Sequence, residues 1–201
     1  MGAESEEDAL VKKRLVAEAA TGALDPRIAA AAAGDRQAAE QLLGELLPRV
    51  GNLVRYLIGR DNDVEDITQT ALLEILRSLG SFRGESKLTT WSDRITSRAT
   101  MAHLRKRRRE TEQRRSAAVE LVAISNEDDS AVEFITRRRA VKRLDVLPEE
   151  QRHVVVLHYV VGLSVPELAE QLAVPFETVR SRLRLGMKKL RENFTNSRGR
   201  P

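Results

Sequence analysis

The 201-residue sequence contains no cysteine, and this absence excludes several kinds of chemistry. Without a thiol the chain cannot form a disulfide, a thiolate nucleophile or a cysteine-based zinc site. Only three histidines are present, and His153 and His158 are five residues apart, a spacing that does not place two imidazoles on one helix face. We therefore expect no metal site and no other cofactor.

The motifs of common enzyme sites are also missing. The sequence contains no glycine-rich phosphate-binding loop and no Gly-x-Ser-x-Gly nucleophile elbow. No apolar run approaches the length of a membrane span, and the acidic residues from Glu4 to Asp8 are unlike the start of a signal peptide. We expect a cytoplasmic protein that is not an enzyme and has no small-molecule substrate.

Charge is abundant in the sequence, and it is unevenly distributed. Lys and Arg total 34 against 30 Asp and Glu, which gives a net charge of +4. Acidic residues gather in segments 4–8 and 127–129, whereas cations gather in segments 105–115 and 180–191. Two separate basic clusters favour nucleic acid over a general acidic substrate as the partner.

Hydrophobic periodicity predicts an all-α protein that consists of two small helical domains joined by a flexible linker. The first domain is expected over residues 25–110, the linker over 111–130, and the second domain over 131–193. Residues 1–24 are predicted to be a mobile extension, and residues 194–201 a disordered tail.

Interruptions of the helical pattern mark the ends of the N-terminal helices. Gly34 ends an alanine-rich segment, Asp35 caps the next helix, and Pro48 is expected to restart or kink that helix. A further helix begins after Asp63 and carries one apolar stripe, formed by Val64, Ile67, Ala71, Ile75 and Leu79. Its polar face, with Asp66 and Gln69, is either a solvated surface or a docking surface, and the sequence alone favours the solvated surface.

The stretch from Phe82 to Arg109 joins a polar loop to a helix that ends in five consecutive cations. The loop from Arg83 to Lys87 offers donors, acceptors and flexible backbone, which suit an unpaired nucleotide better than a groove. Thr90 is predicted to cap the helix, and Trp91 to lie on its buried face. Helical spacing then predicts one exposed flank, which consists of Arg94, Ser97, Arg98 and Met101 and leads into the cations. The simpler alternative is a solvated basic helix end beside a tryptophan that belongs only to the core.

The C-terminal domain has the pattern of a helix-turn-helix. Ser164 and Glu167 form a capping-box pattern at the start of a short helix, and the turn 173–175 separates it from a longer one. On the longer helix, the residues predicted to point outward are Glu177, Ser181, Arg184 and Lys188. Thr178, Arg180 and Leu185 are predicted to flank this outward face. The N-terminal half of such a helix enters the major groove, where Arg pairs with guanine. The alternative is a basic helix that only packs.

Six motifs occur in order between Asp25 and Asn193: VEDITQ, FRGES-x-L-x-TW, the arginine-rich helix end, LP-x-x-x-R, GLS-x-x-E-LA and TV-x-SRL. On these motifs the chain resembles the bacterial RNA polymerase sigma factors of the extracytoplasmic-function group. The resemblance implies a transcription initiation factor that binds core RNA polymerase and directs promoter-specific transcription.

The resemblance also implies three groups of site residues. The clamp coiled coil of the largest polymerase subunit would be contacted by Asp63, Asp66, Gln69 and Leu73. The minus-ten element would be melted and captured by Arg83, Gly84, Glu85, Ser86, Lys87, Trp91, Arg94, Ser97, Arg98, Met101 and Arg105. The minus-thirty-five element would be read by Thr178, Arg180, Ser181, Arg184, Leu185 and Lys188.

The resemblance further implies contact with the polymerase flap and an anti-sigma factor as a partner, either soluble or held at the inner membrane. The chain departs from the usual family pattern at four positions, which are Ser92, Asp93, Ala102 and Glu177. The main alternative is a helix-turn-helix regulator that is not a polymerase subunit, and a third hypothesis is a helical protein-interaction adaptor. Neither alternative predicts promoter opening by the chain with core polymerase.

Overall fold

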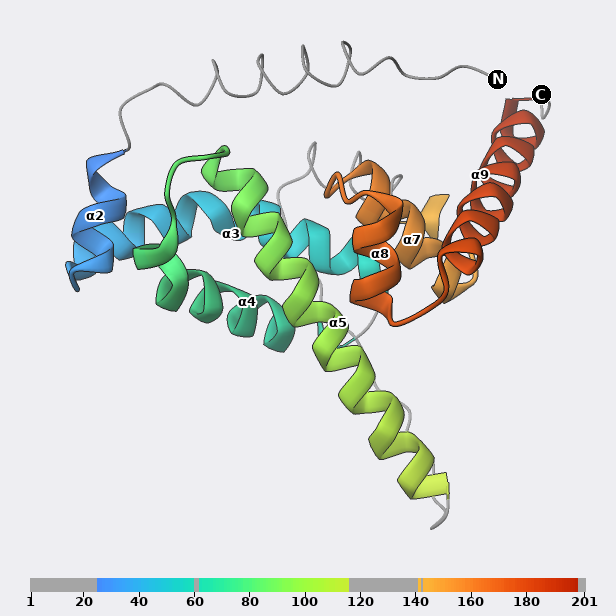
Figure 1. Cartoon of the computed structure of the whole chain (residues 1–201), viewed down its shortest axis with the longest axis horizontal. Helices are drawn as coiled ribbons and strands as arrows, with labels where there is room; N and C mark the ends of the chain where they lie inside the picture. Colours follow the sequence, from blue (N-terminus) through green and yellow to red (C-terminus); the bar gives the residue numbers. More distant parts are fainter. Residues whose placement is uncertain (1–24, 60–61, 116–140, 142, 199–201) are drawn as a thin grey trace.

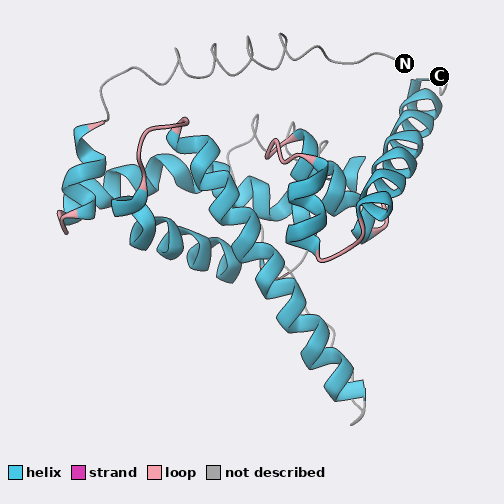
Figure 2. Ribbon diagram, in the orientation of Figure 1, coloured by secondary structure: helices cyan, strands magenta, loops and turns pink. Residues whose placement is uncertain are grey.

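Figure 1 shows the computed structural model of the chain, which describes residues 25–59, 62–115, 141 and 143–198. Every regular element in these residues is a helix, and loops connect the helices (Figure 2), so the predicted all-α fold is confirmed. The elements are α2 (Pro26–Ala32), α3 (Arg36–Ile58), α4 (Val64–Ser78), the 3-10 turn η1 (Leu79–Ser81), α5 (Leu88–Arg115), α7 (Glu149–Tyr159), α8 (Val165–Leu172) and α9 (Phe176–Arg198). Within the described ranges, no helix combines the length and the apolar character that crossing a bilayer requires.

Some predicted segments lie outside the described residues. These are the extension 1–24, residues 116–130 of the predicted linker, residues 131–140 and 142 of the predicted second domain, and residues 199–201 of the predicted tail. Residues 194–198, predicted to be disordered, are instead helical and belong to the end of α9. The start of the predicted linker is described and is helical, because α5 continues to Arg115.

Local capping explains where the first helices begin. The Asp25 side chain accepts a hydrogen bond from the Arg27 amide at 2.9 Å, and the Asp35 side chain accepts one from the Ala38 amide at 3.0 Å. A single helix, α3, then runs through Pro48, so the predicted restart at this proline is wrong. Pro48 and Gly44 both lie on the exposed face of α3, where water can replace the amide donor that proline lacks.

The first three long helices pack around two apolar clusters. One cluster lies between α3, α4 and α5 and consists of Leu46, Val50, Ala71, Ile75, Ile95 and Ala99. The other joins α2 to α3 and η1, and Ile28, Leu42 and Leu79 are at its centre. Because these clusters hold the start of α5 against α3, the loop before α5 has a fixed base.

The C-terminal helices follow the predicted helix-turn-helix closely. Pro148 precedes α7, and Ser164 and Glu167 form both hydrogen bonds of the capping box at the start of α8. Gly186 of α9 faces α7 closely, since a Cβ atom added there would lie 2.9 Å from Cγ2 of Val155. A glycine at this position therefore allows α9 to approach α7.

A third apolar cluster spans both predicted domains. Its members from α3 and α5 are Leu53, Leu57, Met101 and Leu104, and its members from the C-terminal helices include Leu147, Val154, Leu157, Leu168 and Val179. In Figure 1, α7 and α8 accordingly lie beside α3 and the middle of α5, whereas the last turns of α5 extend away from the other helices. The two modules, 25–115 and 141–198, thus share one core.

Candidate nucleic-acid and polymerase interface

The loop before α5 borders an open pocket of about 290 Å³, lined by Ser81, Phe82, Arg83, Glu85, Ser86 and Trp91. The rings of Phe82 and Trp91 have their centroids 5.2 Å apart and are tilted by 58°. Gly84 turns the loop with a positive φ of 71°, a conformation that favours glycine. An aromatic surface beside polar and cationic groups is the combination that binds single-stranded nucleic acid.

Trp91 fits both sequence interpretations, because it packs against the apolar clusters and also lines this pocket. The prediction that Thr90 caps the helix is wrong, since α5 begins at Leu88. The Trp91 amide donates to the carbonyl oxygen of Lys87 at 3.1 Å. The acceptor of this helical hydrogen bond lies three residues before Thr90, so Thr90 is already inside the helix.

The exposed flank predicted for α5 is only partly exposed. Arg94, Arg98 and Arg105 are exposed, but Ser97 is fully buried and Met101 is 3% exposed. The prediction for Ser97 and Met101 is wrong because the C-terminal module covers this side of α5, which a helical wheel for one helix cannot show.

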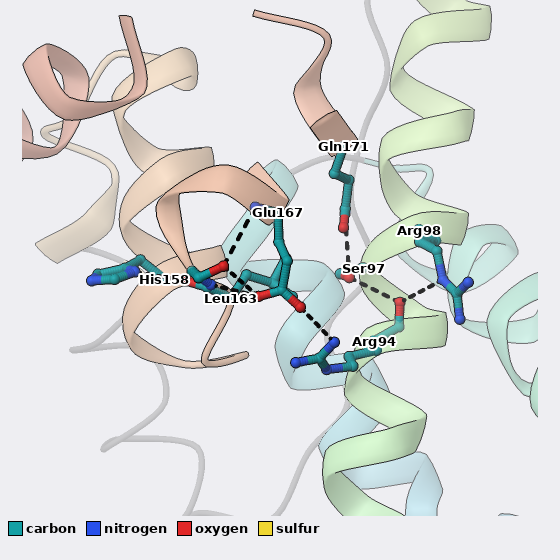
Figure 3. A network of polar contacts seen from close by, with 8 residues as sticks. Arg94, Ser97, Arg98, His158, Leu163, Glu167 and Gln171 are labelled. Carbon is teal, nitrogen blue, oxygen red and sulfur yellow. Dashed lines mark hydrogen bonds and ion pairs between the residues drawn. The ribbon is translucent and has the colours of Figure 1, made fainter. Parts of the chain in front are cut away.

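A polar network connects α5 with α8 (Figure 3). The Arg94 guanidinium donates to Oε1 of Glu167 at 2.8 Å, and the Gln171 amide donates to Oγ of Ser97 at 3.3 Å. About two turns beyond Ser97 on α5, Arg105 donates to the carbonyl oxygen of Gln171 at 3.1 Å. Residues of α8 therefore form hydrogen bonds with α5 side chains that the sequence analysis assigns to binding of the minus-ten strand.

Glu167 uses its second oxygen inside the C-terminal module. Oε2 accepts hydrogen bonds from the Ser164 amide at 2.8 Å and from the Ser164 hydroxyl at 2.7 Å. The bond from the Ser164 amide is the main cause that lowers the pKa of Glu167, and Arg94 contributes further. The carboxylate is thus ionised both as a helix cap and as an ion-pair partner.

Two further contacts hold α7 against the first module. Arg108 of α5 donates to Glu149 at 3.0 Å, and the carbonyl oxygen of Leu57 accepts a hydrogen bond from the buried ring of His153. Nε2 of His153 has no hydrogen-bond partner, and the nearest Glu149 oxygen is 3.8 Å away. Burial lowers the pKa of His153 to about 4, so the ring is neutral at the interface at pH 7.

The predicted polymerase-docking residues fall into two groups. Asp66, Gln69 and Leu73 are exposed along one side of α4, and Leu73 is 51% exposed although it is apolar. Asp63 instead accepts hydrogen bonds from His103 at 3.0 Å and from Arg107 at 3.2 Å. The bond from His103 is the main cause that lowers the pKa of Asp63. Asp63 therefore links α4 to α5, whereas the other three residues form an open surface.

The residues predicted to read duplex DNA lie on the first turns of α9. Arg180, Arg184, Leu185 and Lys188 are exposed, whereas Thr178 and Ser181 are half-buried. The Ser181 hydroxyl donates to the carbonyl oxygen of Thr178 at 2.9 Å, and the Arg180 guanidinium lies 5.8 Å from the centre of the Phe176 ring. The exposed cations on one helix face fit a phosphate backbone and base edges.

One ion pair between a buried carboxylate and a half-exposed arginine was missed by the sequence analysis. Asp93 lies on the buried face of α5 and is held by Arg49 of α3, with two hydrogen bonds of 2.8 and 2.6 Å. A signal was present in the sequence, because no cation stands three or four residues from Asp93 on the same helix. An inward acid of this kind needs a partner from another element.

The chain matches the family description "Sigma-70 region 2" over residues 42–110 and "Sigma-70, region 4" over residues 137–190. It is 31% identical over 160 residues to the ECF RNA polymerase sigma-E factor of Escherichia coli K12, which covers 75% of this chain and 83% of the relative. It is 27% identical over 159 residues to the Haemophilus influenzae protein of the same name, covering 75% and 84% of the two chains.

A similar fold occurs in the sigma factor RpoE of Bartonella quintana, which was solved in complex with the anti-sigma factor NepR. The two chains are 24% identical, with a TM-score of 0.52, and the match covers 78% of this chain and 96% of that chain.

Proposed function

The chain belongs to the extracytoplasmic-function sigma factors, and from this membership we propose how its helices divide the work of promoter opening. As a sigma factor it binds core RNA polymerase and directs promoter-specific transcription. Sigma factors are transcription initiation factors rather than enzymes. The alternative of a helix-turn-helix regulator outside the polymerase is not favoured, because this chain carries region 2 as well as region 4.

The pocket before α5 is proposed to capture one unstacked base of the minus-ten element. The observation that carries this proposal is the pocket itself, which combines the Phe82 and Trp91 rings with the polar loop groups of Arg83, Glu85 and Ser86. An extruded base loses its stacking and pairing, and new contacts must offset that cost. The aromatic rings supply stacking surface, and the arginines of α5 supply a cationic track for the strand.

The exposed face of α9 is proposed to read the minus-thirty-five element, and Asp66, Gln69 and Leu73 of α4 are proposed to dock on the polymerase clamp. The two promoter elements are named for positions about 25 base pairs apart, which corresponds to about 85 Å of straight duplex. The α5 and α8 helices, by contrast, touch through a 2.8 Å ion pair. The two modules must therefore separate before both elements can be bound.

We also propose an anti-sigma partner and a cytoplasmic location, in keeping with membership of this group. The proposal covers both a soluble anti-sigma factor and one that is held at the membrane. Isolation of the chain from uninduced cells should return an additional protein besides polymerase subunits. Recovery of polymerase subunits alone would contradict the partner proposal.

The decisive experiment is run-off transcription with purified core polymerase, the full chain and a library of genomic fragments. We expect a small set of promoter-specific transcripts that depend on the chain. The variant Asp66→Arg with Gln69→Ala should reduce core binding and transcript yield without changing the helical circular dichroism. A chain that binds fragments but yields no transcript would instead support the regulator hypothesis.

A further inference from the structure

Asp93 is a buried carboxylate whose own helix offers it no counter-charge. Its side chain is 4% exposed, and the residues three and four positions away are threonines and a serine. Arg49 of α3 supplies the partner, with Nε donating to Oδ1 at 2.8 Å and Nη2 donating to Oδ2 at 2.6 Å. Two parallel hydrogen bonds of this kind fix both distance and orientation.

The buried hydroxyls beside Asp93 do not provide such a link to α3. Ser92 donates to the carbonyl oxygen of Thr89, Thr96 to that of Ser92, and Thr100 to that of Thr96, so all three bond within their own helix. The remaining neighbours on this side, Ile95 and Ala99, make apolar contacts. Apolar contacts are not directional and allow small rotations of a helix.

We propose that Arg49 and Asp93 form a positioning pair that sets the rotation of the N-terminal part of α5 about its axis, whereas Asp63 holds the middle of α5 through His103 and Arg107. The inference rests on the proposed function, because the rotation of α5 determines where Trp91, Arg94 and Arg98 meet the promoter strand. Asp93 stands two residues after Trp91 and directly before Arg94, so the pair acts at the start of the strand-binding face. With a helix radius of 5–6 Å including side chains, a rotation of about 20° moves side-chain ends by roughly 2 Å. Such a displacement exceeds the tolerance of a hydrogen bond.

Two double variants separate positioning from stability. Arg49→Met with Asp93→Leu replaces the pair by apolar side chains. Such a replacement is often neutral or stabilising for buried groups, and here it applies to Asp93, which is 4% exposed, whereas Arg49 is 48% exposed. Arg49→Gln with Asp93→Asn removes both charges but keeps a directional hydrogen bond. The matched control is Arg36→Ala with Glu40→Ala, which removes an exposed ion pair from the same helix α3.

The first readout needs no polymerase, because Trp91 is the only tryptophan of the chain. We expect the Met/Leu variant to keep the thermal midpoint of the parent but to shift the emission and near-ultraviolet circular dichroism of Trp91. The Gln/Asn variant and the control should retain the parent signals. An unchanged Trp91 signal in the Met/Leu variant, or its failure to fold, would overturn the proposal, since a pair that only positions is dispensable for folding.

The second readout is promoter opening with core polymerase on a fragment obtained from the run-off screen. The Met/Leu variant should open duplex promoter about 10- to 100-fold more slowly than the parent and recover on a promoter pre-melted at the minus-ten element. The Gln/Asn variant should stay close to the parent. Equal opening by both double variants would refute positioning. A parent chain that opens no promoter would defeat the proposed function, yet the Trp91 signals would still decide the role of the pair.

Discussion

Glu167 divides its carboxylate between two partners in different modules. One oxygen caps α8 through Ser164, and the other pairs with Arg94 of α5. Both partners favour the ionised form and lower the pKa of Glu167. The stabilisation from these bonds is therefore complete above the ordinary glutamate pKa of 4.5 and is lost as the pH falls through the lowered value.

The substitution Glu167→Gln should weaken the contact between α8 and α5, because it removes the ion pair with Arg94. The helix cap should remain, because glutamine also serves in a capping box. An exposed ion pair of this type contributes about 0–1 kcal/mol, so binding of a minus-ten single strand should tighten by up to about fivefold. Anisotropy with a labelled single-stranded oligonucleotide measures the change. Glu170→Gln on α8 removes the same charge from an exposed position and serves as control; an equal effect of both variants would rule out the specific pair.

His153 should make the free energy of unfolding depend on pH at values above those at which the carboxylates titrate. Its folded pKa of about 4 lies below the usual 6.5, so the unfolded chain takes up a proton that the folded chain excludes. Stability is complete above pH 6.5 and falls toward pH 4, by up to about 1.4 kcal/mol per unit and about 3 kcal/mol in all. Urea unfolding between pH 7.5 and 5 tests this expectation. His153→Phe should flatten the dependence, and an equal slope in parent and variant would assign it to other groups.

The residue-scale errors of sequence analysis have one physical origin. Ser97 and Met101 lie on the face that helical spacing predicts to be exposed, but a module far along the chain covers them. Asp93 similarly obtains its partner from Arg49, 44 residues earlier. Periodicity describes one helix at a time and contains no information on such long-range contacts.

At the scale of elements, prediction succeeded where local signals are strong. The capping box of α8 and the turn before α9 agree with the sequence prediction because caps and turns act within a few residues. The α5 helix begins earlier and ends later than predicted, at Leu88 and Arg115. Its final turns are polar and lack apolar periodicity, which is the signal that sequence analysis uses.

The close approach of α9 to α7 predicts opposite effects for two glycine substitutions. Gly186→Ala would place Cβ 2.9 Å from the stiff Val155 side chain, so we expect a loss of about 1–3 kcal/mol in unfolding free energy. Gly44→Ala on α3 meets nothing within 4 Å and should gain about 0.5–1 kcal/mol. Denaturant midpoints compare the two variants. A gain for Gly186→Ala would show that α9 can shift without cost.

The loop pocket and α9 should respond differently to a pre-melted promoter. Arg83→Ala with Lys87→Ala should spare closed-complex binding and depress opening, because the loop acts only after a base has left the stack. Arg184→Ala should weaken binding to the upstream duplex element by about 1–3 kcal/mol. Pre-melting should therefore rescue the loop variant more than Arg184→Ala, as measured by permanganate footprinting at fixed salt. Equal rescue would contradict the division of labour between the two elements.

At the scale of the whole molecule, the C-terminal module contacts α5 side chains, several of which are predicted to bind the minus-ten strand. Arg94, Ser97 and Arg105 contact α8, while Arg108 contacts α7 (Figure 3 shows the α8 contacts of Arg94 and Ser97). The α9 face with Arg180 and Arg184 remains exposed in the same arrangement. The chain can thus expose the α9 face that we propose reads duplex DNA, while α8 contacts several of the α5 side chains that we propose bind the minus-ten strand.

The apolar cluster that joins the modules also gives the chain a common folding unit. Leu57 and Leu104 lie in the same cluster as Val154 and Leu168, so neither module has its complete core alone. Amides in α3 and α7 should consequently exchange with solvent through one shared opening event, with similar protection, as residues of a single foldon do. Moving the modules apart then amounts to a subglobal unfolding step. The apolar surface of the shared cluster that this step exposes would have to be buried against the polymerase.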